Sequence, residues 1–154
     1  MPDRSRGYVK AGPLSAPTFR PFGRWLNTMD QDVLTISTRE SDGITLMCLA
    51  GELDSMNVQD LIQTFTSLLE AGKRHFVLDL SELDFIDSAG LGGLVTMWER
   101  SMEHGCFLAL GAQSPRVREV LQITGLQAVL QPHDSIAAAT AAVRRMEEVF
   151  PERA

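Results

Sequence analysis

The sequence predicts an α/β fold, in which a single domain has a mixed, mostly parallel sheet with helices packed against it. Amphipathic helices alternate with short apolar strands along most of the chain, which gives the order ββαβαβαβα. The first two strands are joined by a tight turn and resemble a hairpin, whereas helices separate the later strands. The 154 residues are enough for one domain with a sizeable core.

The hairpin and the first helix follow from the spacing of apolar residues. Residues 33–38 alternate between apolar and polar side chains, Asp42-Gly43 marks a turn, and residues 44–50 form an apolar second strand. An amphipathic helix follows and ends near Gly72. Its apolar positions are Val58, Leu61, Ile62, Phe65, Leu68 and Leu69.

The centre of the chain reads as a strand at residues 76–80, an acidic loop and a second helix. Ser88 stands where a helix N-cap belongs, because apolar residues recur with helical spacing after it. These residues are Leu91, Leu94, Val95, Trp98 and Met102. His104-Gly105 then turns the chain into a strand at residues 106–110.

The last third predicts two helices with a short strand between them. Ser114 and Pro115 fit the N-cap and first position of a helix that ends at Gly125. Residues 128–130 are read as a last strand, and Asp134 is expected to cap the final helix. The apolar stripe of that helix is Ile136, Ala139, Val143, Met146 and Phe150.

Residues 1–30 differ from the rest and are predicted to be a basic leader, disordered or loosely attached, before a domain at 31–152. Four prolines punctuate the leader, and it shows no sustained periodicity. Five cations against two anions give it a charge of plus three, which leaves minus nine for the remaining chain given minus six overall. Widely spaced cations without amphipathicity are a weak signal for nucleic acid or lipid, so a solvated leader is favoured.

Removal of residues 1–28 is therefore expected to leave the fold intact. Unpacked surface segments contribute less than about 0.5 kcal/mol to the free energy of unfolding. Thermal unfolding of the truncated chain measures this contribution. A loss above about 2 kcal/mol would show instead that the leader packs on the core.

Composition argues for a soluble, cytoplasmic protein without cofactors. No apolar run approaches the length of a membrane span, and no signal-peptide pattern opens the chain. Cys48 and Cys106 lie in apolar runs and are read as reduced core residues. The three histidines, His75, His104 and His133, lack the spacing of metal ligands.

The stretch Asp87-Ser88-Ala89-Gly90 is the strongest functional candidate, because it fixes a hydroxyl at a helix start. An anion on Ser88 would be tolerated by the free amides and the positive end of the helix dipole. Small residues in the first turns leave the backbone open to another protein; they are Ala89, Gly90, Gly92, Gly93 and Thr96. The simpler alternative is that Ser88 only caps the helix.

Two further residues belong to the same predicted edge of the sheet. Asp54 ends the second strand and Ser114 follows the fourth, and the carboxyl ends of strands in open α/β sheets form the functional crevice. Asp84 and Asp87 could act as an acid/base pair, although a solvated acidic loop is favoured. A hydrolase is disfavoured because its nucleophile elbow needs G-x-S-x-G, and Ile86 lies two residues before Ser88.

Several stretches in the same order resemble the anti-sigma factor antagonist type of STAS domain. They are Gly51-Glu52-Leu53-Asp54, Leu78-Asp79-Leu80-Ser81, Phe85-Ile86-Asp87-Ser88-Ala89-Gly90-Leu91-Gly92, Ser114-Pro115-Arg116-Val117 and Thr124-Gly125-Leu126. The resemblance covers about residues 33–150 and leaves only the leader unexplained.

The resemblance implies a partner-switching regulator of transcription. The unmodified protein would bind an anti-sigma factor that is also a serine kinase and so release the sigma factor. The kinase would phosphorylate Ser88, and a metal-dependent serine phosphatase would reverse this. The expected partner-binding residues are Asp54, Asp87, Ser88, Ala89, Gly90, Gly93 and Ser114. Ala89 stands where the family often has serine or threonine, and no G-x-x-x-x-G-K phosphate loop is present.

Two other classes of function, a scaffold and an enzyme, are alternatives to this regulatory role. A STAS domain can serve as a non-catalytic scaffold subunit of a stress-sensing or lipid-transport assembly, but larger scaffold relatives usually carry a folded N-terminal sensor, for which thirty residues are too few. An enzyme is disfavoured because no nucleophile, base and oxyanion-stabilising set converges in the sequence. No membrane span and no direct contact with nucleic acid are expected.

Overall fold

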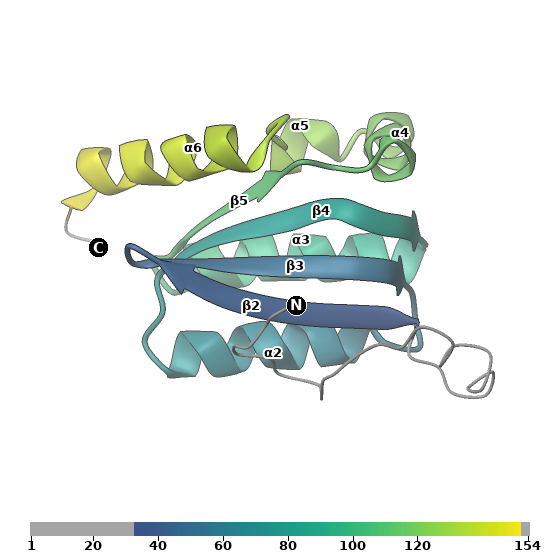
Figure 1. The fold of residues 1–154 in the computed structure, drawn as a ribbon, viewed down its shortest axis with the longest axis horizontal. Coiled ribbons are helices and arrows are strands. Elements are labelled where there is room, and N and C mark those ends of the chain that lie inside the picture. Colours follow the sequence, from purple (N-terminus) through teal and green to yellow (C-terminus); the bar gives the residue numbers. More distant parts are fainter. Residues whose placement is uncertain (1–32, 152–154) are drawn as a thin grey trace.

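The computed structural model describes residues 33–151, which form one four-stranded sheet with helices on both faces. The strands are β2 (Leu34–Ser41), β3 (Ile44–Leu53), β4 (His75–Ile86) and β5 (Phe107–Gly111), in the spatial order β2-β3-β4-β5 (Figure 1). The first pair is antiparallel and the other two pairs are parallel. The predicted mixed, mostly parallel sheet is therefore confirmed.

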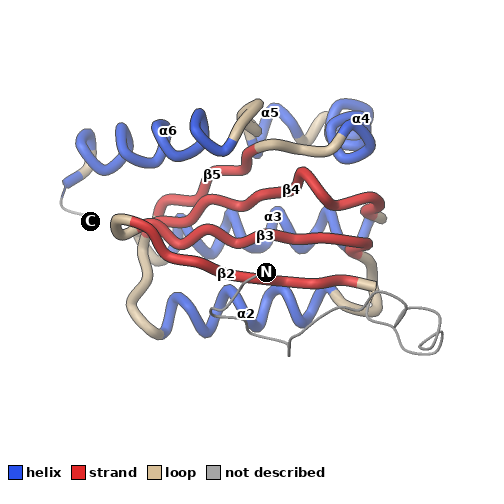
Figure 2. The backbone as a smooth tube through the Cα atoms, viewed as in Figure 1, coloured by secondary structure: helices blue, strands red, loops and turns tan. Residues whose placement is uncertain are grey.

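The described part of the chain contains five helices, two between the strands and three after β5. They are α2 (Val58–Glu70), α3 (Ser88–Glu103), α4 (Pro115–Thr124), α5 (Gln127–Leu130) and α6 (Ile136–Val149). Helices α2 and α3 lie beside each other along one side of the sheet, and α6 runs along β5 (Figure 2). The predicted leader lies outside the described residues.

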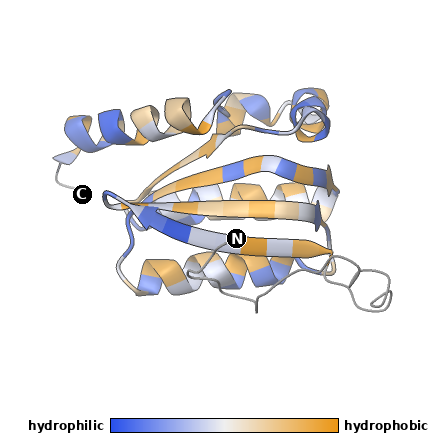
Figure 3. Cartoon of the chain, viewed as in Figure 1, coloured by the Kyte–Doolittle hydropathy of each residue, from blue (hydrophilic) through white to orange (hydrophobic). Residues whose placement is uncertain are grey.

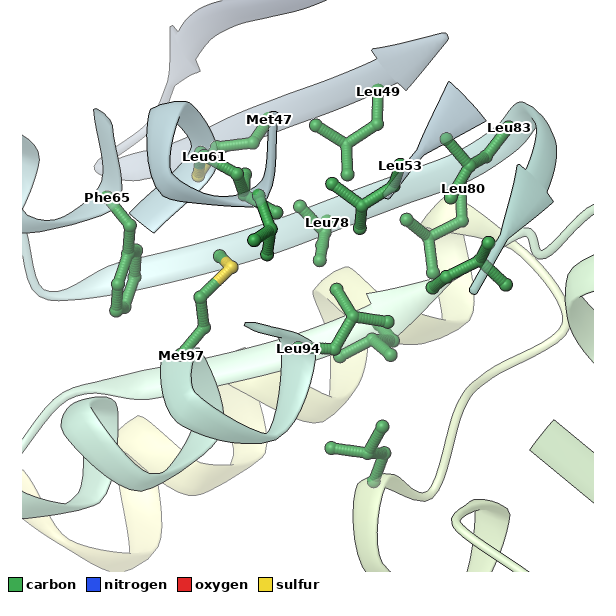
Figure 4. Close-up of a cluster of buried hydrophobic side chains, with 14 of the residues drawn as sticks. Met47, Leu49, Leu53, Leu61, Phe65, Leu78, Leu80, Leu83, Leu94 and Met97 are labelled. Atoms are coloured by element: carbon green, nitrogen blue, oxygen red, sulfur yellow. The ribbon is translucent and has the colours of Figure 1, made fainter. Parts of the chain in front are cut away.

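Strand periodicity divides the core into two clusters, one on each face of the sheet. Met47 and Leu78 pack with the side chains of α2 and α3, while the neighbouring Val77 packs with Ala139 and Val143 of α6. Figure 3 shows that β3 is apolar along most of its length, although most of its residues alternate between buried and half-buried, so one of its faces is only partly covered. In Figure 4, Leu94 and Met97 point from α3 toward the strands and α2.

Strand β4 is longer than predicted and includes the stretch expected to be an acidic loop. Twice along the pairing with β3, β4 carries one residue more than its partner, between Asp79 and Glu82 and between Leu83 and Phe85. Such bulges bend a strand and change the direction of its side chains. The acidic residues Glu82 and Asp84 can therefore be exposed while the backbone remains paired.

The predicted strand at residues 128–130 is wrong, because this segment forms the short helix α5. The Leu130 amide donates to the Leu126 carbonyl at 2.8 Å, so it bonds within its own segment and not to a strand. Its side chain is buried in the core, which explains the apolar sequence signal. After α5, His133 forms an isolated parallel bridge with Gly111 at the end of β5.

The predicted starts of α3, α4 and α6 are right to within one residue. Ser114 and Pro115 occupy the N-cap and first position of α4, and Gly125 ends that helix in the left-handed region, as predicted. The predicted caps Ser88 and Asp134 are each wrong by one residue. Asp87 caps α3 and Ser135 caps α6, because in each case that residue has the extended backbone and accepts the amide three residues later.

The two cysteines have different surroundings. Cys106 is buried, as predicted, whereas Cys48 is only half-buried on β3. Its sulfur lies 3.8 Å from a carboxylate oxygen of Asp79. Burial, followed by the negative charge of Asp79, raises the pKa of the Cys48 thiol to about 11. The thiol therefore stays protonated at neutral pH and is a poor nucleophile.

Candidate functional site

Asp54 and Asp87 lie at the same edge of the sheet, as predicted. Leu53 and Ile86 are paired as the last residues of the parallel strands β3 and β4, and the two aspartates follow them directly. The loops are also bonded to each other, because the Asp87 amide donates to the Leu53 carbonyl at 3.2 Å. The β3–α2 loop and the start of α3 therefore form one continuous surface.

Ser88 is the first residue of α3, and its side chain is exposed. Asp87 precedes it as the N-cap and accepts a hydrogen bond from the Gly90 amide to Oδ1 at 2.9 Å. The cap leaves the Ser88 hydroxyl on the surface, beside a carboxylate and at the positive end of a 16-residue helix. A modifying enzyme can reach a hydroxyl placed in this way.

The β3–α2 loop is held by a set of short hydrogen bonds around Asp54. The Met56 amide donates to Asp54 Oδ1 at 3.0 Å, and the Asp54 amide donates to Asn57 Oδ1 at the same distance. Asn57 also donates from Nδ2 to the Glu52 carbonyl at 2.9 Å, and it is buried. Asn57 was not among the residues predicted from the sequence, although an asparagine before a helical pattern is a recognisable turn signal.

Ser114 is buried and does not lie on the accessible surface, so its predicted role in partner binding stays a prediction without support from its position. Its side chain is only 8% exposed, and its hydroxyl donates to the Leu83 carbonyl at 2.6 Å. The same oxygen accepts the Val117 amide as the cap of α4. Ser114 therefore ties the start of α4 to the end of β4.

Gly90 and Gly93 also face inward, which differs from the expectation that they leave the backbone of α3 open to another protein. A Cβ atom on Gly90 would lie 2.7 Å from the Leu53 carbonyl oxygen, and one on Gly93 would meet the Val58 side chain. The two glycines let α3 approach β3 and α2 closely. Gly92 has open space around it and is exposed, and Ala89 is half-buried.

The orientation of α3 explains this difference. Its buried apolar side chains are Leu91, Leu94 and Met97, while Met102 is 55% exposed. The predicted stripe included Met102 and Trp98 in place of Met97. The glycines at positions 90 and 93 share the buried face with Leu94 and Met97, because residues three and four apart lie on one side of a helix.

Two exposed apolar side chains at this edge were not predicted. Met56 in the β3–α2 loop is 87% exposed, and Phe85 on β4, which pairs with Glu52, is 36% exposed. We call this surface the acidic rim, and it consists of Glu52, Asp54, Met56, Asp84, Phe85, Asp87 and Ser88. Exposed large apolar side chains beside charges are typical of protein-binding surfaces. Phe85 was not predicted because the sequence places it in an acidic loop, whereas the structure continues β4 through it.

The described residues offer little for other kinds of site. Between residues 33 and 151, no group of three or more histidine, cysteine, aspartate or glutamate side chains could hold a metal ion. Within the same range, no helix is both long enough and apolar enough to cross a membrane.

A comparison with known families matches most of the described domain. The STAS domain family matches residues 35–139. This chain belongs to the STAS domain family. The matched region contains the whole acidic rim and the four strands except Leu34, the first residue of β2, so the resemblance noted in the sequence is confirmed.

Relatives within the STAS family carry regulatory names. A Bordetella bronchiseptica protein assigned as an anti-sigma factor antagonist, BtrV, is 34% identical over 103 residues, which cover 67% of this chain and 89% of that protein. The anti-sigma F factor antagonist of Paenibacillus polymyxa is 28% identical over 104 residues, which cover 66% of this chain and 88% of that protein.

Solved STAS structures share the fold. A Thermotoga maritima protein assigned as an anti-sigma factor antagonist has a TM-score of 0.65 at 27% identity, over 71% of this chain and 94% of that chain. The anti-sigma factor antagonist SpoIIAA in its unphosphorylated form has a TM-score of 0.59 at 22% identity, over 71% of this chain and 96% of that chain. The likeness to SpoIIAA concerns the fold alone.

Proposed function

We propose that this chain is an anti-sigma factor antagonist that is switched by phosphorylation of Ser88. In its unmodified form it binds an anti-sigma factor serine kinase in the cytoplasm, so that the sigma factor is released. Phosphorylation by that kinase ends the binding, and a metal-dependent serine phosphatase restores it. The observation that carries the proposal is the exposed Ser88 hydroxyl at a helix start within the acidic rim.

The relatives support the regulatory part of this proposal. BtrV, whose name is that of an anti-sigma factor antagonist, is more than 30% identical over two thirds of this chain. A binding module, and not an enzyme, also fits the chemistry of the rim. Its functional groups are carboxylates and one hydroxyl, and a hydroxyl nucleophile would need a neighbouring base and an oxyanion-stabilising group.

The acidic rim also indicates the kind of surface that the kinase presents. Its carboxylates are Glu52, Asp54, Asp84 and Asp87, and its apolar side chains are Met56 and Phe85. A complementary partner would place lysine or arginine side chains around an apolar patch. Aromatic and methionine side chains at the centre of such an interface contribute most of the binding energy.

Incubation with the cognate kinase and ATP, followed by intact mass spectrometry, tests the modification. The expected product carries one phosphate, which peptide mapping places on Ser88. Ser88→Ala should gain no phosphate, while Ser41→Ala, an exposed serine at the opposite end of the sheet, should be modified like the wild type. Stable binding to a partner without any phosphorylation would contradict the switch and favour a scaffold role.

Asp54→Ala is expected to weaken kinase binding while the free energy of unfolding changes by less than about 1 kcal/mol. The carboxylate accepts a hydrogen bond from the Met56 amide, and this bond is exposed to solvent, so the amide can bond to water once the carboxylate is removed. Binding is measured by calorimetric titration and stability by urea unfolding. A collapse of stability with unchanged affinity in the folded fraction would make Asp54 a purely structural residue.

A further inference from the structure

The chain enters the described domain at the acidic rim. Strand β2 runs antiparallel to β3, so its first residues lie beside the carboxyl ends of β3 and β4, as Figure 1 shows. Leu34 pairs with Gly51, and the Glu52 amide donates to the Val33 carbonyl at 2.8 Å. Val33 is therefore bonded to a residue of the rim itself.

The segment that precedes this entry point has a chemistry complementary to the rim. Residues 19–26 read FRPFGRWL and contain two arginines, three aromatic side chains and no acidic residue. The rim offers four carboxylates together with the exposed side chains of Met56 and Phe85. Arginine pairs with carboxylates, and aromatic side chains pack on exposed apolar ones.

We propose that residues 19–26 dock intramolecularly on the acidic rim and compete there with a protein partner. The docking itself is independent of the proposed function, whereas its consequence for the kinase rests on that function. The leader would then lower the availability of Ser88 and of the rim without contributing much to the stability of the fold.

The connection between Val33 and this segment is long enough for the contact. Arg24 is nine residues before Val33, and nine residues can span up to about 30 Å. Adjacent strands are about 4.8 Å apart, so the end of β4 lies about 10 Å from β2. Both arginines can therefore reach the carboxylates at the ends of β3 and β4.

A weak contact is sufficient because it is intramolecular. Short flexible connections give effective concentrations of about 1 mM or more, so a segment with an intrinsic Kd near 1 mM would occupy the rim about half of the time. Loss of the contact should then raise the affinity for a competing partner about twofold, and by up to about tenfold if the effective concentration is about nine times the intrinsic Kd.

Amide chemical shifts of the full chain test the docking without any partner. Arg20→Glu with Arg24→Glu should shift the amides of the rim, in particular those of Phe85, Asp87 and Ser88. The matched control, Arg4→Glu with Arg6→Glu, makes the same charge change outside the segment and should leave the rim unchanged. Shift changes confined to the substituted leader would overturn the proposal.

Fluorescence of Trp25 tests the same contact from the side of the leader. The chain has two tryptophans, so Trp98→Phe leaves Trp25 as the only one. In this background, Glu52→Lys with Asp84→Lys should red-shift the Trp25 emission and increase its quenching by acrylamide. Glu70→Lys with Glu103→Lys, at exposed sites near the opposite ends of α2 and α3, should not. Circular dichroism confirms folding, and unchanged Trp25 emission in the folded rim variant would overturn the proposal.

Discussion

Phosphorylation of Ser88 should lower the affinity for the anti-sigma factor kinase by roughly 30-fold to several thousand-fold, with little effect on the fold. An unpaired charge forced into a protein interface typically costs about 2–5 kcal/mol, which corresponds to this range of affinities. The phosphate adds roughly 1.5 to 2 negative charges to a rim that already contains four carboxylates.

The domain itself should tolerate the phosphate because two effects nearly offset each other. Repulsion from Asp87 is on the order of 1–3 kcal/mol at the separations that neighbouring residues allow. The favourable interaction of the phosphate with the helix N-terminus contributes about 0.3–2 kcal/mol. Asp87 already accepts a hydrogen bond from the Gly90 amide at this helix end. Between His75 and Glu99 the sequence contains no lysine or arginine that could pair with the phosphate.

Substitutions at Ser88 distinguish the effect of added charge on kinase affinity from the effect of losing the hydroxyl. Ser88→Ala should bind the kinase as tightly as the unmodified protein and remain bound in the presence of ATP. Ser88→Asp should bind more weakly than wild type but more strongly than the phosphorylated form, because it carries less charge. Calorimetric titration against the purified kinase measures all of these forms, with circular dichroism as the control for folding.

Ser41→Asp provides the matched control for these titrations. It places the same charge on an exposed serine at the end of β2 that is distant from the rim. Its affinity should equal that of the wild type. Equal affinities of Ser88→Ala, Ser88→Asp and the phosphorylated protein would reduce Ser88 to a residue at a helix start without a regulatory role.

Two glycines in the first turns of α3 should respond in opposite directions to the same substitution. Gly92→Ala should stabilise the protein by about 0.5–1 kcal/mol, because alanine favours the helix and nothing lies within 4 Å of the added methyl group. Gly90→Ala should destabilise it by about 1–3 kcal/mol, because the new methyl group would lie 2.7 Å from the Leu53 carbonyl oxygen and close to Ile86.

Urea unfolding of the two variants measures the difference directly, and each serves as the control for the other. The helix, the substitution and the sequence neighbourhood are the same, so only the surroundings of the methyl group differ. A stabilised Gly90→Ala variant would show that α3 does not press against the end of β3. A destabilised Gly92→Ala variant would indicate that Gly92 is needed for some other contact.

Local signals in the sequence were sufficient wherever a few neighbouring residues decide the structure. The turn at Asp42-Gly43, the cap at Ser114-Pro115 and the end of α4 at Gly125 follow from preferences of single residues, and all three are found in the structure. Periodicity likewise predicted the mixed sheet and the edge that brings Asp54 and Asp87 together. The exposed position of Ser88 at a helix start was predictable for the same reason.

Tertiary packing decided what these local signals left open. Asp87 and Ser88 can both cap a helix, and the hydrogen bond from the Asp87 amide to the Leu53 carbonyl selects Asp87 by holding its backbone extended. Residues 128–130 are apolar enough for a strand, but core packing of Leu130 accommodates them as a helical turn. The bulges of β4 expose Phe85, and the rotation of α3 buries Gly90. Both depend on distant elements, which is why spacing along the chain could not reveal them.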